Sequence, residues 1–169
     1  MRTHHYQLTG LGLSKVDLLI GTICHENGHL LFRFLDMYDY GKRDGDFEKS
    51  QGIGRYCLMG SGNHLNQRRT PSPVCGYLRA LAGWVDTVID LNTPGVKTAE
   101  HDRYNTVMKF TTDKANEYFI VENRTRLGLD LHLPSSGLAI LHCDTLGSNE
   151  WQDGTRNKHY QCALVQADG

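Results

Sequence analysis

Apolar and polar positions divide the chain into a first part with helical spacing and a second part with strand-like runs. In the first part, a broad apolar surface predicts a buried helix over about residues 15–34. Ser14, followed three residues later by Asp17, resembles a capping box and predicts the start of this helix. The apolar positions of the predicted helix are Leu18, Leu19, Ile23, Leu30, Leu31 and Phe34.

A polar, glycine-rich stretch over residues 36–71 follows this helix and is long for a structureless connection. Loops of this length are usually functional or held in place by ligands. Ser72 and Pro73 then mark the start of a second helix, and Gly83 marks its end.

From Trp84 onward the pattern changes to β-rich runs between turn residues. The predicted strands cover residues 85–91, 104–110, 117–122, 137–142 and 161–165. We therefore expect an α+β fold, with a helical region over residues 1–84 and a mainly antiparallel β region over residues 85–169. The two regions together form one domain, or part of one.

Composition narrows the classes of function. The chain has 169 residues and a formal net charge of −1, which argues against nucleic-acid binding because the phosphate backbone demands clustered positive charge. Apolar runs are too short to span a bilayer. Five scattered cysteines form no CxxC pair, so we expect most of them to be small buried hydrophobic residues.

The segment most informative about chemistry is His25-Glu26-Asn27-Gly28-His29, an HExxH motif within the predicted helix. Four-residue spacing places both imidazoles on one helix face, one turn apart, so that both can reach one metal ion. Glu26 lies beside this face, where it can act as a general base on water that the metal activates. Zn²⁺ suits two imidazoles and a carboxylate. We therefore expect His25 and His29 to be zinc ligands and Glu26 to be catalytic.

A third ligand is less clearly marked in the sequence. In an unbroken helix the backbone of Asp36 would lie about 10 Å along the axis from His29, too far for a shared zinc ion. Asp36 can therefore be a ligand only if the chain turns back near residues 33–35. The alternative third ligands are Asp39, Glu48 and His64.

Six blocks of sequence resemble, in order, signatures of the immune inhibitor A-like family of secreted bacterial metallopeptidases. HENGHLLFRFLDMYDY (25–40) resembles the family's HEFGHxLGLPDLYDY, and GIGRYCLMGSGNH (52–64) resembles its segment with WDLMGSG. The remaining blocks are GYLRALAGW (76–84), EYFIVENR (117–124), LPSSGLAILHCD (133–144) and ALVQADG (163–169).

This resemblance implies an extracellular zinc endopeptidase of the zincin type, acting on a protein or peptide substrate. It implies His25 and His29 as ligands, Glu26 as general base, and Asp36 as the family's acid, reached across a one-residue insertion. Met59 would form a floor under the zinc. Zincins place a sheet before the active-site helix, so we interpret this chain as the C-terminal part of a catalytic domain, in which the activity could be lost.

Several alternatives stay open. Tyr38, Tyr56 or His64 could stabilise the oxyanion during peptide hydrolysis. The acidic run of Asp44, Asp46 and Glu48 could bind Ca²⁺, although a solvated turn is favoured because the glycine of an EF-hand is missing.

Two other classes of function also fit the sequence. Cys57 stands where the family usually has Asp, and this departure fits a catalytically inactive, protein-binding module derived from a zincin. A structural zinc domain closed by His25, His29, Asp36 and His64 is the second alternative. The oligomeric state is not predicted.

Overall fold

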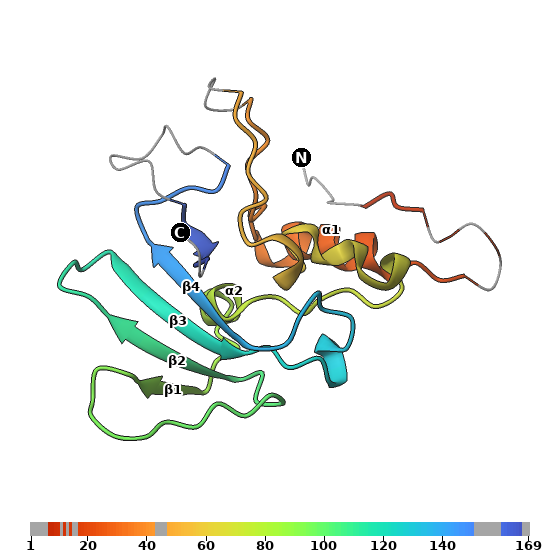
Figure 1. Cartoon of the computed structure of the whole chain (residues 1–169). Helices are drawn as coiled ribbons and strands as arrows, with labels where there is room; N and C mark the ends of the chain where they lie inside the picture. The colour runs from red at the N-terminus through yellow and green to blue at the C-terminus, as the bar shows by residue number, and fades with distance from the viewer. Residues whose placement is uncertain are drawn as a thin grey trace, which may run out of the picture.

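The computed structural model describes residues 7–10, 12, 14, 17–42, 47–150 and 160–166. It has an α+β architecture with a mixed five-stranded sheet of strand order β1-β2-β3-β4-β5. Both α-helices precede the sheet along the chain, and the 3-10 helix η3 (Gly128–Asp130) lies between β3 and β4. Helix α1 lies to one side of the molecule and the sheet to the other, with α2 beside the sheet (Figure 1). Within the described ranges, no helix is both long and apolar enough to cross a membrane.

Helix α1 (Ile20–Phe32) is shorter than predicted, and the expected cap at its start is wrong. The Ser14 hydroxyl bonds the Asp17 carboxylate at 3.2 Å, and Arg69 bonds the same carboxylate at 2.9 Å. These side chains therefore hold a turn ahead of the helix, and no side chain caps α1 at Leu19.

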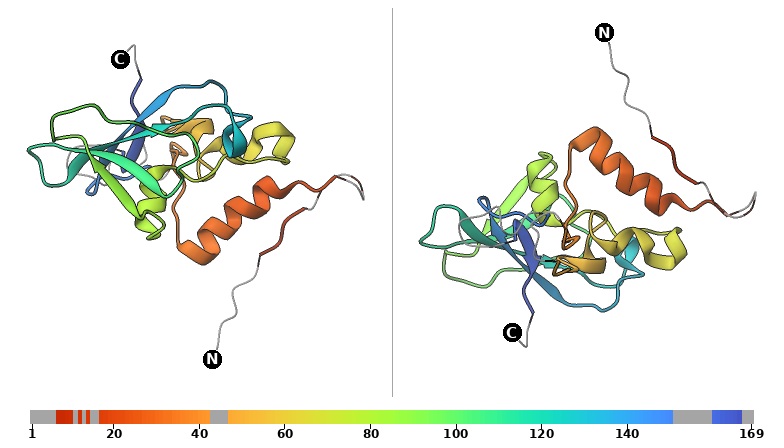
Figure 2. Two further views of the ribbon diagram at one scale, coloured as in Figure 1. Left: turned by 90° about the horizontal axis from the view of Figure 1, so that it is seen from below. Right: turned by 90° about the horizontal axis from the view of Figure 1, so that it is seen from above.

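The glycine-rich stretch is an ordered support for α1. It contains the 3-10 helices η1 (Gly54–Tyr56) and η2 (Ser61–Arg68), and α1 lies against η2 in both views of Figure 2. A Cβ atom at Gly28 would lie 2.5 Å from the Met59 sulfur. The absence of a side chain at Gly28 thus lets the middle of α1 lie directly on Met59.

Helix α2 (Gly76–Leu81) starts later than the predicted Ser72-Pro73 boundary. Ser72 accepts a hydrogen bond from Arg124 at 3.1 Å and therefore does not cap the helix. Gly83, with a φ of 72°, lies just beyond the end of α2, where the sequence predicted the helix to stop.

All five predicted strands are present, with shifts of a few residues at their ends. They are β1 (Thr87–Asp90), β2 (Thr106–Thr111), β3 (Glu117–Asn123), β4 (Leu138–Asp144) and β5 (Cys162–Leu164). Strands β2 to β5 pair antiparallel with their neighbours, whereas β1 pairs parallel with β2. The long connection between β1 and β2 returns the chain to the same end of the sheet, which permits this parallel pairing.

One hydrophobic core contains residues from both halves of the sequence. Its buried members are Phe34, Met37, Ile53, Cys57, Met59, Val74, Cys75, Tyr77, Leu78, Val107, Ile120, Leu141, Cys143 and Cys162. The helical region and the sheet therefore depend on the same packing. Trp84 is 39% exposed and packs edge-on against the Phe32 ring.

A buried arginine joins the two halves through hydrogen bonds as well. Arg124, 2% exposed, donates from Nη2 and Nε to the buried carboxylate of Asp130, at 2.8 Å for the shortest of these bonds. It also donates to the Tyr56 carbonyl at 2.6 Å and to Ser72. Glu122 lies 3.9 Å from Arg124 and pairs more closely with Arg79.

This network generates a stability prediction. Asp130→Asn would leave the Arg124 charge buried with a weakened partner, and removing one member of a buried pair costs about 3–5 kcal/mol. We expect a corresponding fall in the free energy of unfolding, measured by urea titration and circular dichroism.

The matched control is Glu100→Gln, which removes one carboxylate from the exposed Arg103–Glu100 pair. Exposed ion pairs contribute little to stability, so this variant should unfold at nearly the wild-type urea concentration. Equal effects of the two substitutions would contradict the structural role given to Arg124.

Candidate metal centre

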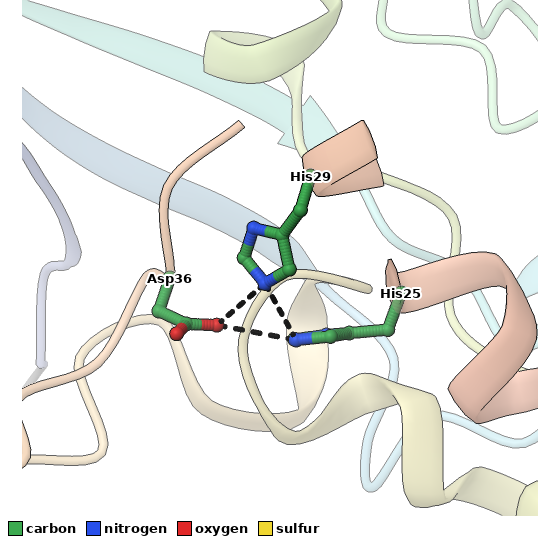
Figure 3. A group of neighbouring side chains, drawn as sticks. All are labelled: His25, His29 and Asp36. Atoms are coloured by element: carbon green, nitrogen blue, oxygen red, sulfur yellow. Dashed lines mark hydrogen bonds and ion pairs between the residues drawn. The ribbon is translucent and has the colours of Figure 1, made fainter. Parts of the chain in front are cut away.

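Three side chains converge at the C-terminal end of α1. His25 and His29 lie one turn apart on the helix, and the loop that follows brings Asp36 to both rings (Figure 3). The two imidazole Nε2 atoms are 3.2 Å apart. Asp36 Oδ1 lies 3.1 Å from Nε2 of His25 and 3.4 Å from Nε2 of His29. These three residues form a group that could hold a metal ion.

A reversal of the chain brings Asp36 into this group. Arg33 has a left-handed backbone (φ 58°) and ends α1, and the next amide, of Phe34, donates to the Gly28 carbonyl at 3.2 Å. The Phe34 side chain then enters the core, and the Met37 amide bonds the Met59 carbonyl at 2.8 Å. The chain therefore turns back near residues 33–35, which is the condition under which Asp36 can be a metal ligand.

Main-chain carbonyls fix the orientation of both imidazole rings. His25 Nδ1 bonds the Leu58 carbonyl at 2.9 Å, and His29 Nδ1 bonds the Phe34 carbonyl at 2.6 Å. Because a carbonyl oxygen only accepts hydrogen bonds, each neutral ring carries its proton on Nδ1 and a lone pair on Nε2. Two nitrogen lone pairs and one carboxylate oxygen therefore point at one another.

Such an arrangement requires a cation, or a proton, between the three atoms. Asp36 is 5% exposed, and its buried Oδ1 atom has no hydrogen-bond donor as long as both rings are neutral and carry their proton on Nδ1. A buried polar atom without a partner is costly. The convergence of three acceptors is thus the feature of the site that calls for a positively charged occupant.

The other carboxylate oxygen of Asp36 is already held by the protein. Tyr40 donates its hydroxyl hydrogen to Oδ2, and the Tyr38 hydroxyl lies 3.0 Å from that of Tyr40. The Asp36 amide donates to Glu150 Oε1 at 3.2 Å. These contacts leave Oδ1 directed toward the two rings and fix the carboxylate in one orientation.

The electrostatics of the metal-free group follow from its geometry. Burial raises the pKa of Asp36, but the bonds to His25, His29 and Tyr40 outweigh it and hold this pKa well below its usual range. For His25, burial lowers the pKa, whereas Asp36 and the Leu58 carbonyl raise it more, so the net shift is upward. The bond to Asp36 raises the pKa of His29 against the effect of burial. Without metal, the group thus favours a proton on the imidazoles.

Glu26 lies on the neighbouring part of the same helix. It is half-buried and lines a surface hollow with His29 and Leu30, and its charge raises the pKa of His29. The carboxylate is therefore close to the His29 imidazole but outside the group of three.

The alternative third ligands lie elsewhere. Asp39 is buried and accepts a bond from the Gly41 amide at 2.7 Å, and His64 is exposed on η2. Glu48 lies between these two residues along the chain, and its side chain is exposed. Within the part of the chain that the structure describes, only Asp36 joins both histidines in a group of potential ligands.

Of the other residues singled out from the sequence, some lie near the metal group and others do not. Tyr56 bonds Ser135 at 2.5 Å, away from the histidines, whereas Tyr38 lies near Asp36 through Tyr40. Met59 lies against Gly28 of α1, and its place as a floor under the zinc stays a prediction. Cys57 is fully buried and accepts a bond from the Cys75 amide. Of the proposed Ca²⁺ run, Asp44 and Asp46 lie outside the described residues.

Comparisons with protein-family models, with curated proteins and with solved structures found no match to this chain. The resemblance to the immune inhibitor A-like family therefore depends on its short motifs alone.

Two residues of the site were missed by sequence reasoning. Tyr40 follows Asp36 by four residues within HENGHLLFRFLDMYDY, and this short separation along the chain could have indicated that the two side chains meet. Glu150 is 114 residues away from Asp36 along the chain, and no local pattern indicates their contact.

The contact with Tyr40 predicts an effect on metal affinity. Removing a hydrogen bond that orients a ligand typically weakens metal binding by about 10- to 100-fold. We expect Tyr40→Phe to weaken zinc binding by about tenfold, measured by competition with a chromophoric chelator. Tyr104→Phe, at the sheet, should bind zinc like the wild type, and an unchanged affinity in Tyr40→Phe would remove Tyr40 from the site.

A second prediction concerns pH. Zinc binds only deprotonated imidazoles. Because Asp36 raises the pKa of both rings, a growing share of the rings carries a proton as the pH falls, and zinc must displace that proton to bind. Titration calorimetry from pH 8 to pH 6 should show an affinity that falls by up to about tenfold per pH unit for each proton displaced. The Asp36→Asn variant should bind zinc more weakly, and its affinity should begin to fall at a lower pH than that of the wild type. A wild-type affinity that does not change with pH would contradict the assigned ligands.

Proposed function

We propose that this chain carries the zinc centre of a metalloendopeptidase, held by His25, His29 and Asp36. The spacing of the three donor atoms supports this proposal most directly. In a tetrahedral site with zinc bonds of about 2.0–2.1 Å, neighbouring donor atoms lie about 3.3 Å apart. The three separations in this protein are 3.2, 3.1 and 3.4 Å.

The types of donor atom also favour zinc over Ca²⁺. Two imidazole nitrogens and one carboxylate oxygen are a common set of ligands in catalytic zinc sites, whereas Ca²⁺ takes six to eight oxygens. The hydrogen bonds from both Nδ1 atoms to carbonyls and from Tyr40 to Asp36 are the kind of outer contact that orients metal ligands.

A site with three protein ligands suits catalysis better than a structural role. Structural zinc sites are closed by four protein ligands, whereas catalytic sites keep one position open. Among the described residues no fourth potential ligand joins the group, and His64, which a closed site would need, is outside it. This supports hydrolysis over the structural alternative.

The protein's own residues would then have separate roles in the reaction. When bound, zinc would polarise the substrate carbonyl and lower the pKa of water. Glu26, beside His29, accepts a proton from the attacking water and returns it to the leaving amine. The buried Asp36 and the fixed rings hold the site in one geometry, so that little reorganisation is needed during the reaction. An extracellular location and a protein or peptide substrate belong to this proposal.

Substitution of the proposed general base gives the test. General acid–base catalysis typically contributes about 10²- to 10⁴-fold to rate. In the zinc-loaded protein, Glu26→Gln should reduce hydrolysis of a quenched fluorescent peptide or casein by at least about 100-fold, while zinc stoichiometry stays at one.

Controls separate the role of Glu26 from general effects of charge. Glu100→Gln, which removes a carboxylate from the remote exposed pair, should hydrolyse peptide at the wild-type rate. Undiminished turnover in Glu26→Gln would exclude Glu26 as the base. Stoichiometric zinc in a wild-type protein that neither hydrolyses peptide nor binds a hydroxamate would overturn the enzymatic proposal.

A further inference from the structure

Two buried cysteines face each other across neighbouring strands of the sheet. Cys143 in β4 and Cys162 in β5 are directly opposed in the antiparallel register, and both are fully buried. Their sulfur atoms lie 3.9 Å apart. Both are free thiols in this structure.

The hydrogen-bond pattern shows which kind of cross-strand pair they form. The Val165 amide bonds the Ile140 carbonyl at 2.8 Å, and the Asp144 amide bonds the Gln161 carbonyl at 3.1 Å. Hydrogen-bonded and non-hydrogen-bonded pairs alternate along an antiparallel ladder, so Cys143 and Cys162 form a non-hydrogen-bonded pair. The Cα atoms of such a pair are about 4.5 Å apart, within the range that a disulfide bridges.

A neighbouring side chain independently supports this assignment. In a non-hydrogen-bonded pair, the amide and the carbonyl of Cys162 point away from β4. Both are bound there by Asn149, which donates to the Cys162 carbonyl at 2.8 Å and accepts from its amide at 2.9 Å. Asn149 is itself 1% exposed.

We propose that Cys143 and Cys162 are a site of oxidation and form a cross-strand disulfide that fixes β5 to the sheet. The sulfur atoms must approach by less than 2 Å to reach a bond length of about 2.05 Å. Rotation of the two side chains supplies this movement without a change of register. This inference does not depend on the zinc centre.

The reaction requires a disulfide oxidant, for which oxidised glutathione is the simplest case. One Cys thiolate attacks the oxidant, forms a mixed disulfide and releases one glutathione thiolate. The second Cys thiolate then displaces the other glutathione, so two protein thiols are oxidised and one disulfide is reduced to two thiols.

The short edge strand explains how an oxidant reaches buried thiols. Strand β5 has three residues and, among the described residues, lies at the edge of the sheet beside β4, so its local opening is a route that exposes Cys162. The neighbouring thiols of Cys143 and Cys75, together with burial, raise the pKa of Cys162, so oxidation should be faster at higher pH.

The disulfide would also stabilise the part of the chain beside the metal group. Asn149 bonds Cys162, and the next residue, Glu150, accepts a bond from the Asp36 amide. Closing the loop of residues 144–161 reduces the freedom of the unfolded chain and fixes this connection in the folded one.

The test is disulfide mapping of the whole chain after incubation with oxidised glutathione at pH 8. The protein is then unfolded, alkylated, digested and measured by mass spectrometry without reduction. We expect one linked pair of peptides containing Cys143 and Cys162, with Cys24, Cys57 and Cys75 alkylated. The melting temperature should rise by roughly 5–10 °C on oxidation and fall back to that of the unoxidised protein after reduction.

Matched variants make the result specific. Cys57→Ser changes a buried cysteine outside the pair and should retain both the linked peptides and the rise in melting temperature on oxidation. Cys143→Ser should lose both. Alkylation of Cys143 and Cys162 in the oxidised wild type, or a link from Cys75 to Cys162, would overturn the proposal. Mapping of the wild type decides this even where a variant fails to fold.

Discussion

The reversal of the chain after α1 is the constraint on which the candidate site depends. A helix continued beyond Phe32 would carry Asp36 away from both histidines. Instead, the left-handed backbone at Arg33 ends the helix, and Phe34 anchors the returning chain in the core. The energy for bringing a carboxylate to two imidazole lone pairs thus comes from packing and main-chain hydrogen bonds outside the group of three. The protein holds the acceptors together before any cation arrives.

A second layer of organisation keeps that turn in place. The loop after α1 bonds the main chain at Met59, and the segment around Met59 is in turn held near the sheet by Arg124 through Tyr56 and Ser72. A buried guanidinium is costly unless its donors are satisfied. Here the donors are satisfied only when the glycine-rich segment and the sheet are both folded. Folding of the sheet and order at the histidines are therefore coupled.

The sequence predicted the features that depend on local spacing. The two histidines four residues apart and the glycine after α2 both express short-range geometry, and both agree with the structure. The capping of α1 by Ser14 was wrong because Ser14 bonds Asp17, which Arg69 also binds, in a turn ahead of the helix. The start of α2 at Ser72 was wrong because the Ser72 hydroxyl accepts a hydrogen bond from the distant Arg124. The contact of Glu150 with Asp36, and the parallel pairing of β1, depend on long-range packing that no local pattern encodes. Metal binding and catalysis remain predictions.

The carbonyl acceptors of the two imidazole rings have a consequence for how the protein tolerates change. Both acceptors belong to the main chain, at Leu58 and Phe34, rather than to side chains. Replacing the side chain at either position leaves the oxygen atom present, provided that the backbone keeps its path. The tautomers are thus set by the path of the main chain, and the side chains of Leu58 and Phe34 act on the rings only through the packing that holds this path.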